Sequence, residues 1–230
     1  MLVEFKNLNK SYNHKEVLKD INLNIPSGKI IGLLGPNGSG KTTMIKLIND
    51  LIQPSSGELL INGLKPGIES KKIISYLPDK TYLNMNMKVT ELIEFFKDFY
   101  SDFDEDKAIS LLEKLHIKKE DKLKTMSKGT KEKVQLVMVM SRKAELYILD
   151  EPIGGVDPAS RDYILETILT NFNEGASLII STHLISDIEK ILDQAIFINN
   201  GKIVLNEDAD TIRTKKKTTI DKLFREEFKC

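Results

Sequence analysis

Hydrophobic residues follow two different spacings in the first part of the chain. Apolar and polar residues alternate over residues 2–8 and 17–25, which predicts strands of a half-buried antiparallel sheet. Residues 30–34 form a continuous apolar run, typical of a parallel strand buried on both faces. Further short strands are expected at 58–62 and 73–77. This part of the chain is therefore expected to combine a parallel core with an antiparallel β subdomain.

The middle of the chain has helical spacing. From about Thr90 to Arg142 the apolar residues recur every three or four positions. One apolar stripe consists of Leu92, Phe95, Phe96 and Phe99. We interpret this stripe as the interior of a helical lobe, residues 85–145, that is inserted between two halves of the core.

The core pattern resumes after the helical lobe. Strands are expected at 146–149, 178–181 and 195–198, separated by helices at about 158–172 and 184–192, and Asn200-Gly201 predicts a hairpin turn. The whole chain is expected to be one α/β domain with a mixed sheet, in which residues 1–84 and 146–206 form the core. The lysine-rich tail, 207–230, is expected to be a solvated terminal helix.

A glycine-rich loop separates the strand at 30–34 from the next helix. Residues 35–42 read Gly-Pro-Asn-Gly-Ser-Gly-Lys-Thr, which matches the phosphate-binding pattern G-x-x-x-x-G-K-[ST] in full. Glycines let consecutive backbone N–H groups turn toward phosphate oxygens, and the helix N-terminus adds its positive dipole. Lys41 is expected to reach the β- and γ-phosphates, and Thr42 to offer its hydroxyl to Mg²⁺. The residues expected to surround the phosphates are Gly35, Pro36, Asn37, Gly38, Ser39, Gly40, Lys41, Thr42 and Thr43.

Two acids and a histidine follow later strands. Asp150 and Glu151 end the apolar run that begins at Leu146, at the sheet edge where open α/β folds bind ligands. We expect Asp150 to hold Mg²⁺. Side chains alternate along an extended chain, so Glu151 is expected to point elsewhere and to act as the base for the attacking water. His183 could contact the γ-phosphate, although a structural histidine is the commoner interpretation.

Charge and cysteine content limit the partners and the compartment. Lys plus Arg and Asp plus Glu both number 34, so the formal net charge is zero and no nucleic-acid partner is expected. The chain has one cysteine, Cys230, which excludes an intrachain disulfide. The N-terminal residues lack the pattern of a signal peptide. We therefore expect a cytoplasmic protein.

Taken in order, these motifs resemble those of ATP-binding cassette (ABC) transporter subunits, over about residues 1–206. GPNGSGKTT at 35–43 resembles the Walker A motif and LYILDEP at 146–152 the Walker B motif, while GGVDP at 154–158 resembles the D-loop and STH at 181–183 the switch histidine. The resemblance implies that Tyr12 stacks on adenine. It also places the signature loop at Met126-Ser127-Lys128-Gly129-Thr130, where Ser127 and Gly129 match the family pattern and Lys128 and Thr130 depart from it.

The family usually has glutamine where this chain has Asp79, and an aspartate there could still approach Mg²⁺. The resemblance implies that ATP and Mg²⁺ are bound between two cassettes, each covering the other's ATP with Ser127 and Gly129. It also implies a separate transmembrane permease, a location on the inner face of the membrane and, from the Ser-Lys-Gly signature, export. Two alternatives stay open: a regulatory or ribosome-acting cassette, and a module that binds ATP but hydrolyses it poorly.

Overall fold

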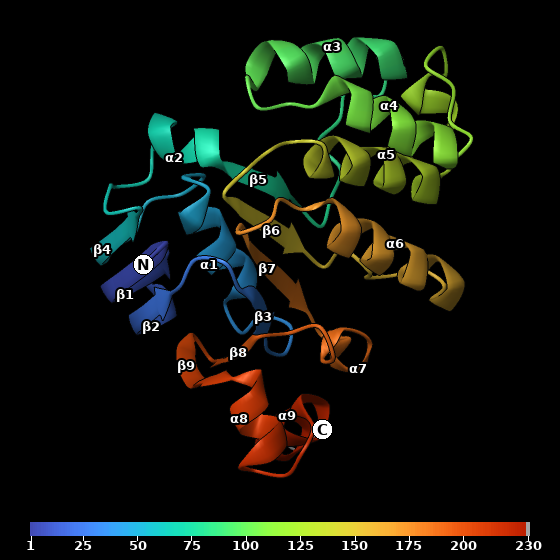
Figure 1. Ribbon diagram of the computed structural model, residues 1–230. Coiled ribbons are helices and arrows are strands. Elements are labelled where there is room, and N and C mark those ends of the chain that lie inside the picture. Colours follow the sequence, from blue (N-terminus) through green and yellow to red (C-terminus); the bar gives the residue numbers. More distant parts are fainter. Residues whose placement is uncertain (229–230) are drawn as a thin grey trace.

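The computed structural model describes residues 1–228 and begins with a small antiparallel sheet (Figure 1). Strands β1 (Val3–Tyr12), β2 (Lys15–Ile25) and β4 (Ser56–Ile61) pair in the order β2-β1-β4. Both ladders are antiparallel, with Val3 opposite Ile25 on one side and Ile61 on the other. The alternation buries Val3 and Phe5, so the antiparallel β subdomain is confirmed.

A larger mixed sheet carries most of the core. Its strands are β3 (Ile30–Leu34), β5 (Ile74–Leu77), β6 (Leu146–Asp150), β7 (Ser177–Thr182), β8 (Gln194–Asn199) and β9 (Lys202–Asp208). They lie in the order β5-β6-β7-β3-β8-β9; β5 to β8 are parallel, and β9 returns antiparallel to β8. Asn200 and Gly201 form the turn with φ of 46° and 77°, the left-handed conformation that such a hairpin requires. The expected mixed α/β fold is confirmed.

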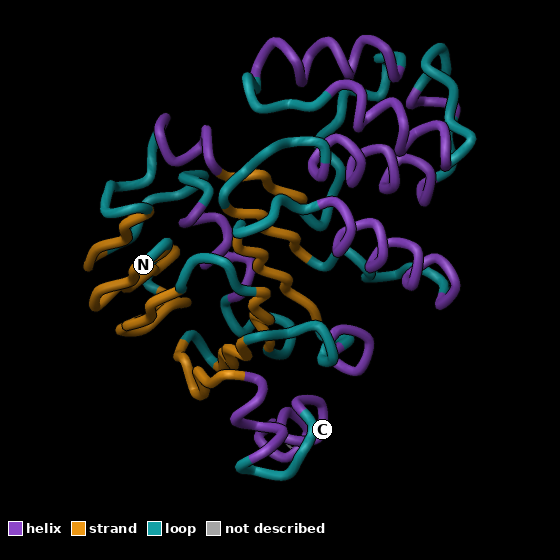
Figure 2. Tube along the Cα trace, in the orientation of Figure 1, coloured by secondary structure: helices purple, strands orange, loops and turns teal. Residues whose placement is uncertain are grey.

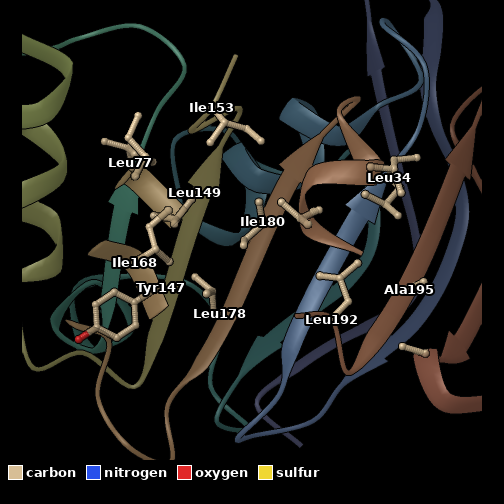
Figure 3. Close-up of a cluster of buried hydrophobic side chains, with 14 of the residues drawn as sticks. Leu34, Leu77, Tyr147, Leu149, Ile153, Ile168, Leu178, Ile180, Leu192 and Ala195 are labelled. Atoms are coloured by element: carbon tan, nitrogen blue, oxygen red, sulfur yellow. The ribbon is translucent and has the colours of Figure 1, made fainter. Parts of the chain in front are cut away.

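Both faces of the large sheet are buried, as its continuous apolar runs predict. On one face, β6 directs Leu146 and Ile148 toward α1 (Lys41–Ile48) and the small sheet. On the other face it directs Tyr147 and Leu149 toward α6 (Pro158–Asn171). Figure 3 shows this second face, where Ile168 of α6 lies among side chains from neighbouring strands. The strands are therefore fixed on both sides, and the loops at their carboxyl ends start from a rigid base.

The inserted lobe consists of three helices, α3 (Val89–Phe99), α4 (Glu105–Lys114) and α5 (Lys128–Met140), beside the sheet (Figures 1 and 2). Leu92 and Phe96 are buried in its interior, as expected. Phe95 and Phe99 are 41% and 70% exposed, and their rings lie 4.5 Å apart between centroids. The aromatic stripe is therefore split between the core and the surface. The exact boundaries proposed for the lobe and core stay a prediction.

Arg142 connects the lobe to the large sheet just after α5. Its guanidinium is buried and donates hydrogen bonds to Asp102 at 3.0 and 3.1 Å, to the Lys72 carbonyl at 2.6 Å, and to the Ile74 carbonyl. The same group lies over the Tyr100 ring, 3.9 Å from its centroid. One side chain thus joins the end of α3, the start of β5 and the end of α5.

Two expectations about the last third of the chain were wrong. The helix expected at 184–192 is α7 (Ile185–Ile188), because turns follow it. The tail is not a solvated helix: β9 extends to Asp208 and is followed by α8 (Ala209–Thr214) and α9 (Ile220–Phe228). Phe224 of α9 packs edge-on against Phe197 of β8 at 5.4 Å, so the amphipathic tail closes one face of the core.

Cys230 lies outside the described residues. Two short elements, α2 (Ile68–Ile73) and the 3₁₀ turn η1 (Leu123–Thr125), are additional.

Candidate functional site

Four neighbouring parallel strands deliver the candidate residues to one edge of the sheet. The strands β5, β6, β7 and β3 are adjacent, and Asp150 lies opposite Ser181 while Leu34 lies opposite Thr182. Parallel strands that end together place the loops after them side by side. The loops that carry Asp79, Glu151, His183 and the glycine-rich sequence therefore meet there.

Close packing and backbone conformation explain two of the glycines in the loop 35–42. A Cβ atom on Gly35 would lie 2.3 Å from the Ile198 carbonyl oxygen, so no other residue fits. Gly40 has φ of 120°, a conformation that side chains disfavour, and it directly precedes α1. The hairpin after β8 supports the loop, since the Gly201 N–H donates to the Ser39 carbonyl at 2.9 Å.

Lys41, the first residue of α1, is 6% exposed and folds back over the loop. Its ammonium donates to the carbonyl oxygens of Gly35 at 2.7 Å and Pro36 at 3.3 Å. Burial lowers the pKa of Lys41, whereas the carboxylates of Glu151 and Asp150 raise it. The cation therefore lies inside the loop with two acids near it.

Asp150 ends β6 and is 2% exposed. Its carboxylate accepts a hydrogen bond from the Ser181 hydroxyl of β7. Burial raises the pKa of Asp150, against the opposing effect of hydrogen bonds from Ser181 and Thr42. A nearby cation would stabilise the ionised form of a carboxylate that is buried in this way.

Glu151 leaves the strand in a way that the sequence did not predict. Its φ is 52°, so it is not extended, and the argument from side-chain alternation was wrong there. Its N–H still donates to the Ser181 carbonyl at 2.9 Å, which anchors the turn. One Glu151 carboxylate oxygen lies 3.0 Å from Nδ1 of His183, so the second acid and the histidine form a contact pair.

The loops enclose an open cavity of about 530 Å³, within the range of small-molecule sites. Much of its wall is the glycine-rich loop, residues 37–43. Asp79, Glu151 and His183 line it from the neighbouring loops, and Lys128 lines it from α5. The buried Ser39 hydroxyl has no hydrogen-bond partner among the described residues. A buried hydroxyl without a partner is a polar group that a bound ligand or an ordered water would satisfy.

Six predicted site residues of the described chain do not line this cavity: Gly35, Pro36 and Asp150, which adjoin residues that do or bind them, and Ser127, Gly129 and Tyr12. Ser127 caps α5, where its Oγ accepts from the Thr130 N–H at 3.1 Å. Gly129 is exposed, and a Cβ added there would meet no atom within 4 Å. Tyr12 ends β1 and is 41% exposed, with the Lys10 ammonium 5.0 Å from its ring centroid. Ser127, Gly129 and Tyr12 are absent from the cavity lining of the described chain.

Two residues at the site had no role assigned from the sequence. Ser181 binds Asp150, and Val17 of β2 lines the cavity. The pairing of β6 with β7 places Ser181 opposite Asp150, and that register is not readable from either strand alone. Val17 comes from a strand of the small sheet, far from the motif in the sequence.

Known proteins share both the sequence and this geometry. The family model described as ABC transporter matches residues 18–154. A Bacillus subtilis protein described as the SkfA peptide export ATP-binding protein SkfE is 32% identical, over 88% of this chain and 87% of its own length. A solved ATP-binding subunit of an ABC transporter superposes with a TM-score of 0.88 at 28% identity, covering 98% of this chain and 99% of its own. The chain therefore belongs to the ABC transporter family, as an ATP-binding subunit that hydrolyses ATP to drive transport.

The fold is also that of a cassette solved as a dimer in a post-hydrolysis state with ADP and Pi. The TM-score is 0.78 at 23% identity, over 90% of this chain and 99% of that one. That solved cassette is a dimer. In the described part of this chain, none of the helices combines the length and apolar character needed to cross a bilayer.

Proposed function

We propose that the 530 Å³ cavity binds the triphosphate of ATP, with residues 35–43 around the phosphates. Two observations support this: the Ser39 hydroxyl is buried without a partner, and the Lys41 ammonium rests on carbonyl oxygens of its own loop. Phosphate oxygens are stronger partners for an ammonium than neutral carbonyls are. ATP would therefore draw Lys41 from Gly35 and Pro36 toward the β- and γ-phosphates.

The residues beside the phosphate loop suit Mg²⁺. Thr42 offers a hydroxyl, and Asp150 and Asp79 offer carboxylates, all of them hard oxygen ligands. No group of three or more acidic, histidine or cysteine side chains among residues 1–228 could hold a metal by itself. Mg²⁺ would thus share its shell with phosphate and water, and it would neutralise charge on the transferred phosphoryl group.

Glu151 is proposed as the base that orients and polarises the attacking water. It lines the cavity beside the phosphate loop, and His183 holds one of its carboxylate oxygens at 3.0 Å. That contact leaves the other oxygen for water. His183 would act by positioning Glu151 and by contacting the γ-phosphate, whose loss on hydrolysis it would register.

The site is proposed to be completed by a second cassette, identical or different. Ser127 and Gly129 lie at an exposed helix N-terminus outside the cavity of their own chain. A helix N-terminus with free N–H groups binds anions, so this one can cover the γ-phosphate held by a partner. Tyr12 is proposed to stack on the adenine of its own ATP. ATP would then stabilise the closed dimer, and hydrolysis would release it.

A second cavity, of about 460 Å³, lies between the lobe and the sheet. We propose that a transmembrane permease docks there, which places the chain on the inner face of the membrane. Aromatic rings of Tyr76, Tyr82 and Tyr100 line the cavity, beside the cations Lys46 and Lys80. Phe95 and Phe99 extend an apolar surface nearby on α3. The name of the SkfE relative supports export as the direction.

Centrifugation with nucleotide tests this proposal directly. The Glu151→Gln variant should sediment as a monomer without nucleotide and as a dimer with MgATP, since binding persists while hydrolysis stops. A variant that binds MgATP and stays monomeric would contradict the sandwich. Co-purification with a membrane subunit rather than with ribosomes would separate the transporter from a ribosome-acting cassette.

A further inference from the structure

A small polar cavity lies behind the proposed nucleotide site, where α5 approaches the sheet. It has a volume of about 60 Å³. One wall comes from a single face of α5, at the helical spacing of Lys128, Glu132, Gln135 and Leu136. The cavity therefore lies between the helical lobe and the core.

The opposite wall consists of the loops that follow β5 and β6. Asp79 and Glu151 line this cavity as well as the larger one in front of it, so the two spaces share part of their walls. Helix α5 contacts β5 and α6, and Figure 1 shows these elements close together. A group bound in the small cavity would touch the lobe on one side and the hydrolysis site on the other.

Gln135 is the unusual member of the wall. It is 2% exposed, and its Oε1 has no hydrogen-bond partner among residues 1–228. A buried amide oxygen without a partner costs free energy, and such oxygens in native proteins usually bind an ordered water. The volume of about 60 Å³ exceeds the roughly 10–15 Å³ that a single water needs.

Asp79 is exposed on the loop after β5 and lines the same cavity, so it offers a second acceptor for that water. It has no hydrogen bond or ion pair with any of the described residues. Glu151 and Asp150, by contrast, already contact His183 and Ser181. A water has two O–H donors, and both Gln135 Oε1 and the Asp79 carboxylate are acceptors, so one water can satisfy both.

We propose that Gln135 is a positioning residue for ATP hydrolysis and acts through a water that it shares with Asp79. This inference rests on the proposed function, because it assumes that Asp79 approaches the metal. The same helix that carries Gln135 begins at the exposed Ser127–Gly129 loop. The water bridge therefore connects the nucleotide site of a chain to its own helix α5. The N-terminus of that helix is the part proposed to cover the nucleotide of the partner.

A double-mutant cycle on the full chain tests the bridge. Gln135→Met keeps the length of the side chain and removes the acceptor, and it should lower kcat about five- to tenfold, the effect of one hydrogen bond, with MgATP affinity within about twofold. In an Asp79→Ala background, where the bridge is already lost, the same change should alter kcat less than about twofold. Leu136→Met, on the same wall and without a polar group, is the matched control and should leave kcat unchanged.

Several results would overturn the proposal. A Gln135→Met protein with wild-type kcat would do so. An equal loss of kcat in the wild-type and Asp79→Ala backgrounds would also do so, because a purely structural role of Gln135 predicts that result. A high-resolution crystal structure of the unmodified protein provides evidence that does not depend on a variant folding. It should show a water hydrogen-bonded to both Gln135 Oε1 and Asp79, and a dry cavity would refute the bridge. Loss of MgATP binding by the unmodified chain would instead contradict the proposed function itself.

Discussion

The loops at the strand ends and the N-terminus of α5 both carry proposed ATP-binding residues, but they are built differently. Around residues 35–43 the structure supplies close packing, buried polar groups and a cavity within one chain. Around Ser127 and Gly129 it supplies an exposed cap with open space beside it. A region that is nearly complete alone suits substrate binding, and one that is incomplete alone suits a partner's site. Under the proposed function, each chain would therefore contribute one part to each of the two ATP sites of a dimer.

The largest effect is expected from Glu151→Gln, which removes the proposed base. Turnover should fall by about 10²- to 10⁴-fold, the usual contribution of general base catalysis, while MgATP affinity changes little. Phosphate release and nucleotide titration on the purified protein measure both. Glu145→Gln is the matched control, because Glu145 is exposed and directly precedes the opposite end of the same strand. Equal losses in the two variants would remove Glu151 from catalysis.

Arg142→Met should have the largest effect on stability. It would leave Asp102 and the carbonyls of Lys72 and Ile74 without their cation, at a cost of about 3 kcal/mol in the free energy of unfolding. Urea denaturation measures this loss. Lys143→Met breaks an exposed ion pair with Asp104 at 3.1 Å and should cost less than about 1 kcal/mol. Similar losses in both variants would show that Arg142 is not the connection between lobe and sheet.

The sequence predicted the core better than the contacts between its parts. Local spacing was sufficient for the buried strands and for the position of the glycine-rich loop 35–42, because the apolar run at 30–34 and the loop that follows it are contiguous in the sequence. It failed where a distant segment decides the outcome. The hydrogen bond from Ser181 to Asp150 depends on strand register, and the tail is ordered because Phe224 meets Phe197. Glu151 was placed at the correct edge for an incorrect local reason, since its backbone is not extended.

Lys41→Ala tests the glycine-rich loop around residues 35–43. It should weaken MgATP binding about tenfold to a hundredfold, the usual effect of one charge-assisted contact. The ammonium already lies 2.7 Å from the Gly35 carbonyl, so the loop itself holds it close to the proposed phosphate position. Calorimetric titration measures the affinity. Lys46→Ala, at an exposed position in the last turn of the same helix, should leave it unchanged. Unchanged binding in Lys41→Ala would contradict the assignment.

Gly129→Leu tests the N-terminus of α5. Introduced into the Glu151→Gln variant, it should weaken the ATP-driven dimer at least about tenfold, because a leucine side chain would occupy space that the partner's phosphates need. A Cβ atom added at Gly129 meets no neighbour within 4 Å in the monomer, and the position is exposed, so folding and monomer ATP affinity should persist. Sedimentation against protein concentration measures the dimer. A dimer of undiminished affinity would show that the α5 N-terminus does not face the partner's nucleotide.

Tyr12→Ala is expected to have the smallest effect, a loss of MgATP affinity of about two- to tenfold, because one aromatic stacking contact contributes roughly 0.5–1.5 kcal/mol. The ring is 41% exposed, with the Lys10 ammonium 5.0 Å from its centroid, so its surface is accessible to a base. Tyr12→Phe keeps the ring and should bind as the unmodified chain does. Inorganic triphosphate, which has no base, should bind all three proteins equally. If Tyr12→Ala also lost affinity for inorganic triphosphate, its defect would lie in the glycine-rich loop and not in the contact with the base. Comparing the two ligands therefore separates loss of the adenine contact from damage to the surrounding fold.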